Sequence, residues 1–162
     1  MSYSNFKKAL EQAKTLPEYK IYDCCSDKAM DELEDYLGFE LSKQHYEFLH
    51  LGKMEVRYFE FCANYKDMHT MAPDIIFDYE YNKKNGFVMR EKCVPLLEED
   101  EENYYLDYNR LTKEGEPMVT VGVAIPEEFV LFEELNMDLG DFLLQCWEDV
   151  KVAEEYEKNG NW

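Results

Sequence analysis

The sequence predicts an α+β domain in which N-terminal helices precede a central, mostly antiparallel sheet and a C-terminal helix packs on that sheet. Apolar residues recur with helical spacing up to Gly52. After Gly52 the chain becomes rich in aromatic and β-branched residues, in short runs that turn residues separate. Helical spacing returns from Leu139 onward. No repeat or linker interrupts this order, so residues 1–162 are expected to form one domain.

Two helices are expected before Gly38. The first has a possible cap at Ser4 and an apolar side made by Phe6, Leu10 and Ala13. The second begins at Ser26 or Asp27, and its apolar face carries Met30, Leu33 and Leu37. The connection between these two helices has no clear periodicity, so no structure is assigned to it.

The stretch "LEDYLGFELSKQHYEFLHLG", residues 33–52, predicts two helices joined by a tight corner. Gly38 stands where a helix commonly ends in the left-handed conformation. Ser42 can cap the next helix, which ends near Gly52. Because the outer face of this corner is strongly acidic, it is not expected to read DNA.

Several short runs have the composition of strands. They are "VRYFEFC" (56–62), "IIFDYEY" (75–81), "FVM" (87–89), "CVPLL" (93–97), "YYLDY" (104–108) and "MVTVGVAI" (118–125). In the second run, Ile75, Phe77, Tyr79 and Tyr81 alternate as if on one face. Pro95 indicates an edge strand or a bulge. The closing helix is expected from the spacing of Leu139, Phe142, Leu143, Cys146, Val150 and Ala153.

The charge balance is strongly acidic, with 36 Asp and Glu against 17 Lys and Arg and a formal net charge of −19. Such a surface repels nucleic-acid phosphates, so direct DNA or RNA binding is not expected. It favours solubility and rapid capture of a basic partner. The alternative interpretation is a solvated acidic surface with no binding role.

The cysteines and the apolar runs favour a cytoplasmic protein. The five cysteines are an odd number without a C-x-x-C framework, which indicates reduced thiols rather than disulfides or a zinc site. The first residues lack the apolar core of a signal peptide. No run approaches the roughly 18 apolar residues of a membrane helix.

The segment "MDELEDYLGFELSKQHYEFLHLG" (30–52) resembles the SUKH superfamily of bacterial toxin-immunity proteins, which also includes a fungal cell-wall regulator. The matching positions there are Leu33, Leu37, Gly38, Phe39, Leu41, Tyr46, Phe48 and Leu49. Further on, Pro95, Tyr105, Leu106, Asp107, Phe142 and Leu143 match later family positions. Two residues depart from the family pattern: Ser42 replaces a proline and Leu51 replaces an asparagine. The family-like core spans about residues 26–150.

This resemblance implies an immunity protein that binds and occludes a cognate protein toxin, such as a nuclease with a basic active site. The alternative within the same superfamily is a non-catalytic regulatory or scaffold protein that binds a host protein. A third alternative is a mimic of nucleic acid, in which carboxylates would form one long stripe at phosphate-like spacing.

The candidate partner-binding residues are an acidic run and the tyrosines after it: Glu98, Glu99, Asp100, Glu101, Glu102, Tyr104 and Tyr108. Carboxylates speed the capture of a basic partner, and tyrosine rings can anchor it. The alternative is a solubilising hairpin loop followed by rings that belong to the core. The run lacks the spacing of a calcium loop.

Catalysis, a cofactor and a metal site are not expected. His45 and His50 are five residues apart, which does not align them as a metal pair on a helix, and His69 lies in a probable loop. Motifs for a serine nucleophile, a zinc protease or a phosphate-binding loop are missing from the sequence.

Overall fold

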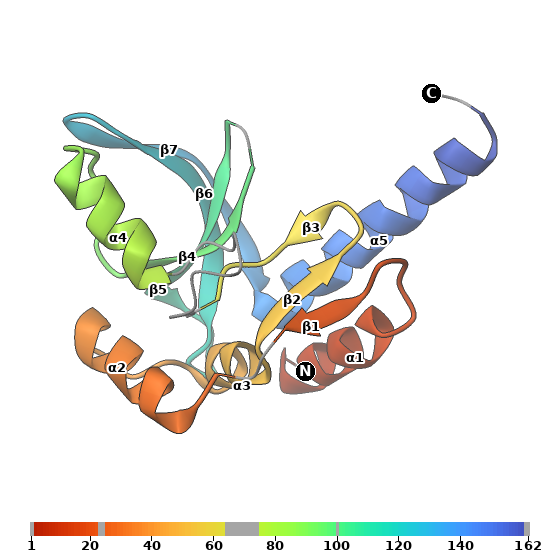
Figure 1. Ribbon diagram of the computed structural model, residues 1–162, viewed down its shortest axis with the longest axis horizontal. Helices are drawn as coiled ribbons and strands as arrows, with labels where there is room; N and C mark the ends of the chain where they lie inside the picture. The colour runs from red at the N-terminus through yellow and green to blue at the C-terminus, as the bar shows by residue number, and fades with distance from the viewer. Residues whose placement is uncertain (1, 23–24, 64–74, 100, 161–162) are drawn as a thin grey trace.

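The computed structural model describes residues 2–22, 25–63, 75–99 and 101–160. Within them lie five helices and two antiparallel sheets, one of three strands and one of four (Figure 1). The helix-first order and the mixed content confirm the expected α+β class. The long C-terminal helix packs on the four-stranded sheet, as expected, and also against the first helix.

The N-terminal elements are α1 (Ser2–Ala13), β1 (Lys20–Tyr22), α2 (Asp27–Leu37) and α3 (Lys43–Leu51). The corner between α2 and α3 forms as the sequence predicts. Gly38 has a φ of 82°, and the Ser42 hydroxyl accepts a hydrogen bond from His45 N at 3.3 Å. Helix α1 begins two residues before the expected cap at Ser4.

The three-stranded sheet has the order β1–β2–β3, with β2 at Lys53–Val56 and β3 at Phe59–Glu60. The run "VRYFEFC" is therefore a hairpin that reverses at Arg57 and Tyr58, because Val56 pairs with Phe59. Tyr58 takes a φ of 77°, which is uncommon for a residue with a side chain.

The four-stranded sheet has the order β4–β5–β6–β7: β4 (Cys93–Glu98), β5 (Asn103–Leu111), β6 (Pro117–Ile125) and β7 (Glu128–Asp138). Strand β4 lies at an edge, and its register shifts between Pro95 and Leu97. Pro95 therefore marks both an edge and a bulge, as expected. Strand β7 was not expected from the sequence.

The expectation of a strand at 75–81 is wrong, because this segment is helix α4 (Ile75–Lys84). Its alternating residues also form two pairs at i, i+4. Ile75 is buried and the Tyr79 hydroxyl donates to Cys93 O, so this pair packs inward. Phe77 and Tyr81 stack on the exposed side with centroids 6.1 Å apart. Alternation over only seven residues therefore could not distinguish a strand from a helix.

The expected strand at 87–89 is also absent from the described pairing. Phe87 makes one isolated bridge with Pro126, and the Val88 N–H donates to Ile125 O at 3.0 Å. Two contacts of this kind tie the segment to the tip of the β6–β7 hairpin without extending into a ladder.

Helix α5 (Leu139–Lys158) closes the core. Asp138 caps it, and Trp147 is fully buried with its Nε1–H donating to Ala9 O at 2.9 Å. Phe61 meets the Trp147 ring edge-to-face at 5.9 Å. The side chains of the described cysteines, Cys25, Cys62, Cys93 and Cys146, are buried and form no disulfide.

Candidate partner-binding groove

The two sheets meet at one short junction. Phe61 pairs with Leu97 as an isolated bridge, and the Cys62 N–H donates to Leu96 O at 2.9 Å. Figure 1 shows the chain after β3 passing from the three-stranded sheet toward the four-stranded one. The next antiparallel pair would place Glu60 opposite Glu98, but the described pairing stops before it. Glu60 and Glu98 therefore both lie beside this junction.

A groove opens where the strands part, and we call it the seam groove. Among the described residues of its lining, the carboxylates are Glu18, Glu55, Glu60, Glu98 and Glu99, and the one ammonium is that of Lys20. Its apolar lining is Val56, Tyr58, Phe59 and Leu97. Tyr58 is 49% exposed, and the Arg57 guanidinium lies 5.3 Å from the centre of its ring. The groove thus combines excess negative charge with accessible aromatic surface.

Three of the groove's charged residues stand in one row across the first sheet. Lys20 pairs with Glu55, and Glu55 pairs with Glu60. Lys53 lies beneath them, 3.4 Å from Glu55 and 3.7 Å from Glu60, with only 4% of its side chain exposed. It offsets part of the negative charge on this side of the seam.

Asp78, on α4, adds a further carboxyl behind the β4 side of the groove. Burial, with the charge of Glu98 and a hydrogen bond to it, raises the pKa of Asp78 to about 7. Burial also raises the pKa of the Cys62 thiol well above its usual value, with Glu98 and Asp78 adding to the effect. Cys62 is therefore a packed thiol rather than a reactive thiolate.

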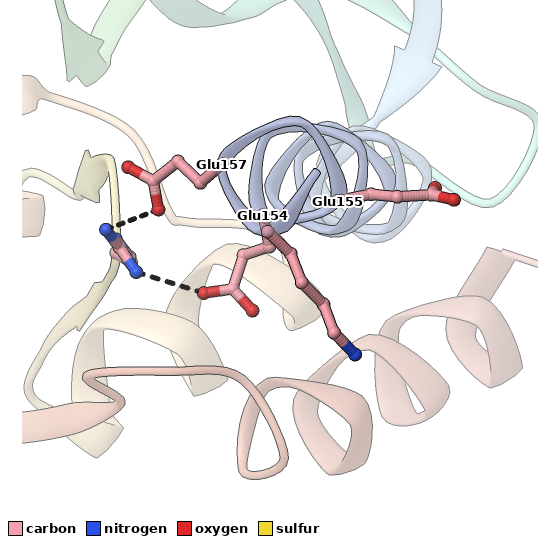
Figure 2. Close-up of a pocket in the computed structure, with 5 residues that line it drawn as sticks. Glu154, Glu155 and Glu157 are labelled. Atoms are coloured by element: carbon pink, nitrogen blue, oxygen red, sulfur yellow. Dashed lines mark hydrogen bonds and ion pairs between the residues drawn. The ribbon is translucent and has the colours of Figure 1, made fainter. Parts of the chain in front are cut away.

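A second acidic groove lies on the other side of the β2–β3 turn, against the end of α5. Its described lining consists of Arg57, Glu154, Glu155, Glu157 and Lys158. Figure 2 shows two of these carboxylates converging on one guanidinium while Glu155 points away. The Arg57 nitrogens lie 3.2 Å from Glu154 and 2.6 Å from Glu157. Two of its three carboxylates are therefore already paired with the protein's own arginine.

The structure divides the predicted acidic run. Glu98 and Glu99 line the seam groove, whereas Glu101 and Glu102 are exposed in the loop between β4 and β5. The Glu99 N–H donates to Glu102 O at 3.1 Å, which closes this loop. Asp100 lies outside the described residues.

The two predicted tyrosines have internal contacts instead. Tyr104 packs on Phe142 with centroids 5.2 Å apart, and burial raises its pKa to about 12. Tyr108 packs on Phe39 at 4.6 Å, and its hydroxyl accepts from Ser42 N at 3.0 Å. Both rings join β5 to helices, so the proposed contact surface does not depend on them.

Sequence reasoning missed the residues that face Glu98 across the seam. Tyr58 and Glu60 were assigned to a strand, and Glu18 and Glu55 were not singled out. The turn that exposes Tyr58 could have been sought within the run "VRYFEFC", since seven residues are enough for a short hairpin. The junction between the two sheets joins residues that are far apart in the sequence, so no local sequence pattern predicts it.

The histidines of the described segments have structural partners. His45 is buried, its Nδ1 lies 2.8 Å from the Tyr108 hydroxyl, and burial lowers its pKa to about 3. His50 Nε2 lies 3.0 Å from Asp27 Oδ1. His69 lies outside the described residues. No cluster of three or more potential metal ligands occurs in the described segments.

In the part of the chain that the structure describes, no helix combines the length and the apolar character needed to cross a membrane. Comparison of the chain with protein-family models and with curated proteins finds no match to either.

Proposed function

We propose that this protein binds a positively charged partner protein and blocks it, in the manner of an immunity protein that occludes its toxin. The seam groove is the proposed contact. The observation that carries the proposal is the composition of this groove, whose described lining holds five carboxylates and one ammonium beside the half-exposed Tyr58. Charge steers such a partner toward the groove, and the ring anchors it.

The position of Tyr58 supports a binding role. A side chain at φ 77° is strained by about 1 kcal/mol, and glycine would relieve that strain. The protein nevertheless keeps a half-exposed aromatic residue at the tip of this turn, where its ring lies 5.3 Å from the Arg57 guanidinium. Strain of this kind is concentrated at functional sites.

The class of partner follows from the resemblance to the SUKH superfamily and from the charge. Enzymes that act on phosphates hold them with lysine and arginine, and carboxylates can occupy the same cationic site. A toxin with a basic active site, such as a nuclease, is therefore the proposed partner.

Co-expression with the product of a toxin gene adjacent to this protein's own gene tests the proposal. We expect this protein to restore growth and to copurify with the toxin at low salt. A charge-matched pair of variants locates the contact: Glu60→Gln with Glu98→Gln in the groove, and Glu114→Gln with Glu128→Gln on exposed surface elsewhere.

We expect the Glu60→Gln, Glu98→Gln protein to lose the ability to restore growth and the Glu114→Gln, Glu128→Gln protein to retain it. Growth arrest in the presence of wild-type protein, with no complex at low salt, would reject the immunity role. An equal loss of growth restoration in both double variants would reject the seam groove as the contact.

A further inference from the structure

We propose that the outer edge of β7 binds an extended, basic segment of a partner protein as a fifth strand of the four-stranded sheet. None of the described residues that line the seam groove belongs to β7, so this is a second surface. The inference goes beyond the proposed function and does not depend on it. The contact consists of main-chain hydrogen bonds along β7 and of the side chains at its centre.

The main chain of β7 is paired on one side only. With 11 residues it is the longest described strand, and in the sheet order it follows β6 at the end of the sheet (Figure 1). Among the described residues, no main-chain group outside β6 is hydrogen-bonded to residues 129–135. Such an edge presents N–H and C=O groups that can pair with another strand. Addition of a strand is a common way in which proteins bind extended peptides.

Packing within the sheet holds this edge in place. A Cβ added at Gly122 would lie 2.6 Å from the Phe129 ring, so this ring lies directly over the glycine of β6. Further along β7, the Arg110 side chain donates to Leu135 O at 3.0 Å and lies 2.9 Å from Glu134. A strand that is already held in its bound conformation loses little conformational entropy on binding.

Two large apolar side chains are exposed at the centre of the edge. Leu131 is 46% exposed and Phe132 is 49% exposed. Residues 128–131 pair with β6 in unbroken register, and Phe132 is the extra residue of the bulge that follows. The stretch before the bulge therefore supplies the regular main-chain ladder. Side chains of an added strand lie about 5 Å from their neighbours on β7, so they can cover these two apolar groups.

Charge selects the occupant of this edge. Glu133 and Glu134 are exposed next to the apolar pair, and Arg110 is bound to Glu134. A second copy of this chain would bring a net charge of −19 and the same two glutamates, and repulsion between like charges opposes that pairing. A strand that carries lysine or arginine forms attractive cross-strand pairs instead. The edge therefore favours a basic strand over self-association.

Calorimetric titration of the full-length protein with defined peptides tests the inference. The probe is an octapeptide in which lysine alternates with valine. Its control has the same sequence with every amide nitrogen methylated, which keeps the charge and the side chains but removes the main-chain donors. At about 0.15 M salt, where long-range attraction to the acidic surface is screened, we expect the methylated peptide to bind at least about tenfold more weakly.

Hydrogen exchange and a charge-matched pair of variants localise the binding. We expect the lysine peptide to slow exchange of the β7 amides and to leave those of β1–β3 unchanged. Glu133→Lys replaces attraction by repulsion at the edge and should weaken binding about fivefold. Glu114→Lys makes the same change of charge in the turn before β6, at the other end of that strand, and should stay within about twofold of wild type. Both variants should melt as cooperatively as wild type.

Equal affinity for the two peptides, or equal weakening in the two variants, would overturn the inference. Slow exchange of the β7 amides in the free protein, together with a dimer in sedimentation, would assign the edge to a second copy and overturn it as well. The proposed function fails separately. A protein that binds the lysine peptide along β7 but protects against no toxin rejects only the immunity role, whereas one that protects but does not discriminate the peptides rejects only the added strand.

Discussion

At the scale of the residue, the candidate site is decided by which carboxyl groups lie together. Glu98 is shared between the seam groove and Asp78, so one side chain connects the proposed contact with the electrostatics of α4. Glu60 and Glu98 line the same groove, where we propose that a positively charged partner binds.

Titration of Asp78 makes stability depend on pH. Its pKa is about 7 in the folded protein, above the usual 3.8, so folding favours the protonated form. That contribution is complete below about pH 4 and is lost as the pH rises through about 7. The free energy of unfolding should therefore fall as the pH rises from about 4 to about 7, and we expect this fall to be smaller in Asp78→Asn. Urea titrations at a series of pH values measure it.

The pH test has an independent control in Glu98→Gln. This change removes the neighbouring charge, so the pKa of Asp78 should fall and the same decline in stability should become shallower. Identical pH profiles for wild type and both variants would contradict the Asp78–Glu98 interaction.

Tyr108 is expected to act in folding rather than in partner binding. Tyr108→Phe removes the acceptor for the Ser42 N–H and the partner of His45 Nδ1. Loss of these contacts should lower the free energy of unfolding by about 1 to 2 kcal/mol. Partner affinity should be unchanged at a temperature where the variant is folded. Tyr81→Phe, on the exposed side of α4, is the matched control and should change neither quantity.

At the scale of the element, local sequence explains the helix ends well. Ser26, Ser42 and Gly38 have the cap geometries that their residue types predict. It explains α4 poorly, because Ile75, Phe77, Tyr79 and Tyr81 satisfy a period of 2 and also the i, i+4 spacing. Strand β7 was missed because it is an edge strand whose centre is exposed and acidic at Glu133 and Glu134. Its pairing with β6 continues through these two residues, and its first part, "FVLF" (129–132), has the composition of a strand.

The close approach of α1 and α5 gives an element-scale prediction. A Cβ added at Gly140 would lie 2.6 Å from the Phe6 nitrogen and 2.8 Å from its Cα, and backbone cannot move away cheaply. We expect Gly140→Ala to lower the free energy of unfolding by about 3 kcal/mol. Gly38→Ala meets nothing within 4 Å, so only its left-handed φ of 82° opposes the change, by about 1 kcal/mol. Chemical denaturation of the two variants measures the difference, and equal losses would contradict the tight packing.

At the scale of the whole molecule, the net charge of −19 should govern how fast a basic partner arrives. We expect the association rate to fall steeply between about 0.05 and 0.5 M salt, because the screening length shortens to a few ångströms. Dissociation should change less, since it depends on contacts made in the groove. Stopped-flow measurements with the isolated toxin provide both rates. An association rate that is insensitive to salt would assign the acidic surface to solubility alone.

The sequence by itself determined the fold class, the corner of helices, the bulged edge strand at Pro95 and the acidic character of the surface. These follow from local spacing, caps and composition, each of which acts within a few residues. Tertiary structure decided that α4 is a helix, that Tyr104 and Tyr108 pack against other parts of the protein, and that Glu98 and Glu60 line one groove. The last depends on the pairing of Phe61 with Leu97, 36 positions later in the chain. Register between distant strands is set by the packing of the whole core, so no local pattern could have revealed the groove.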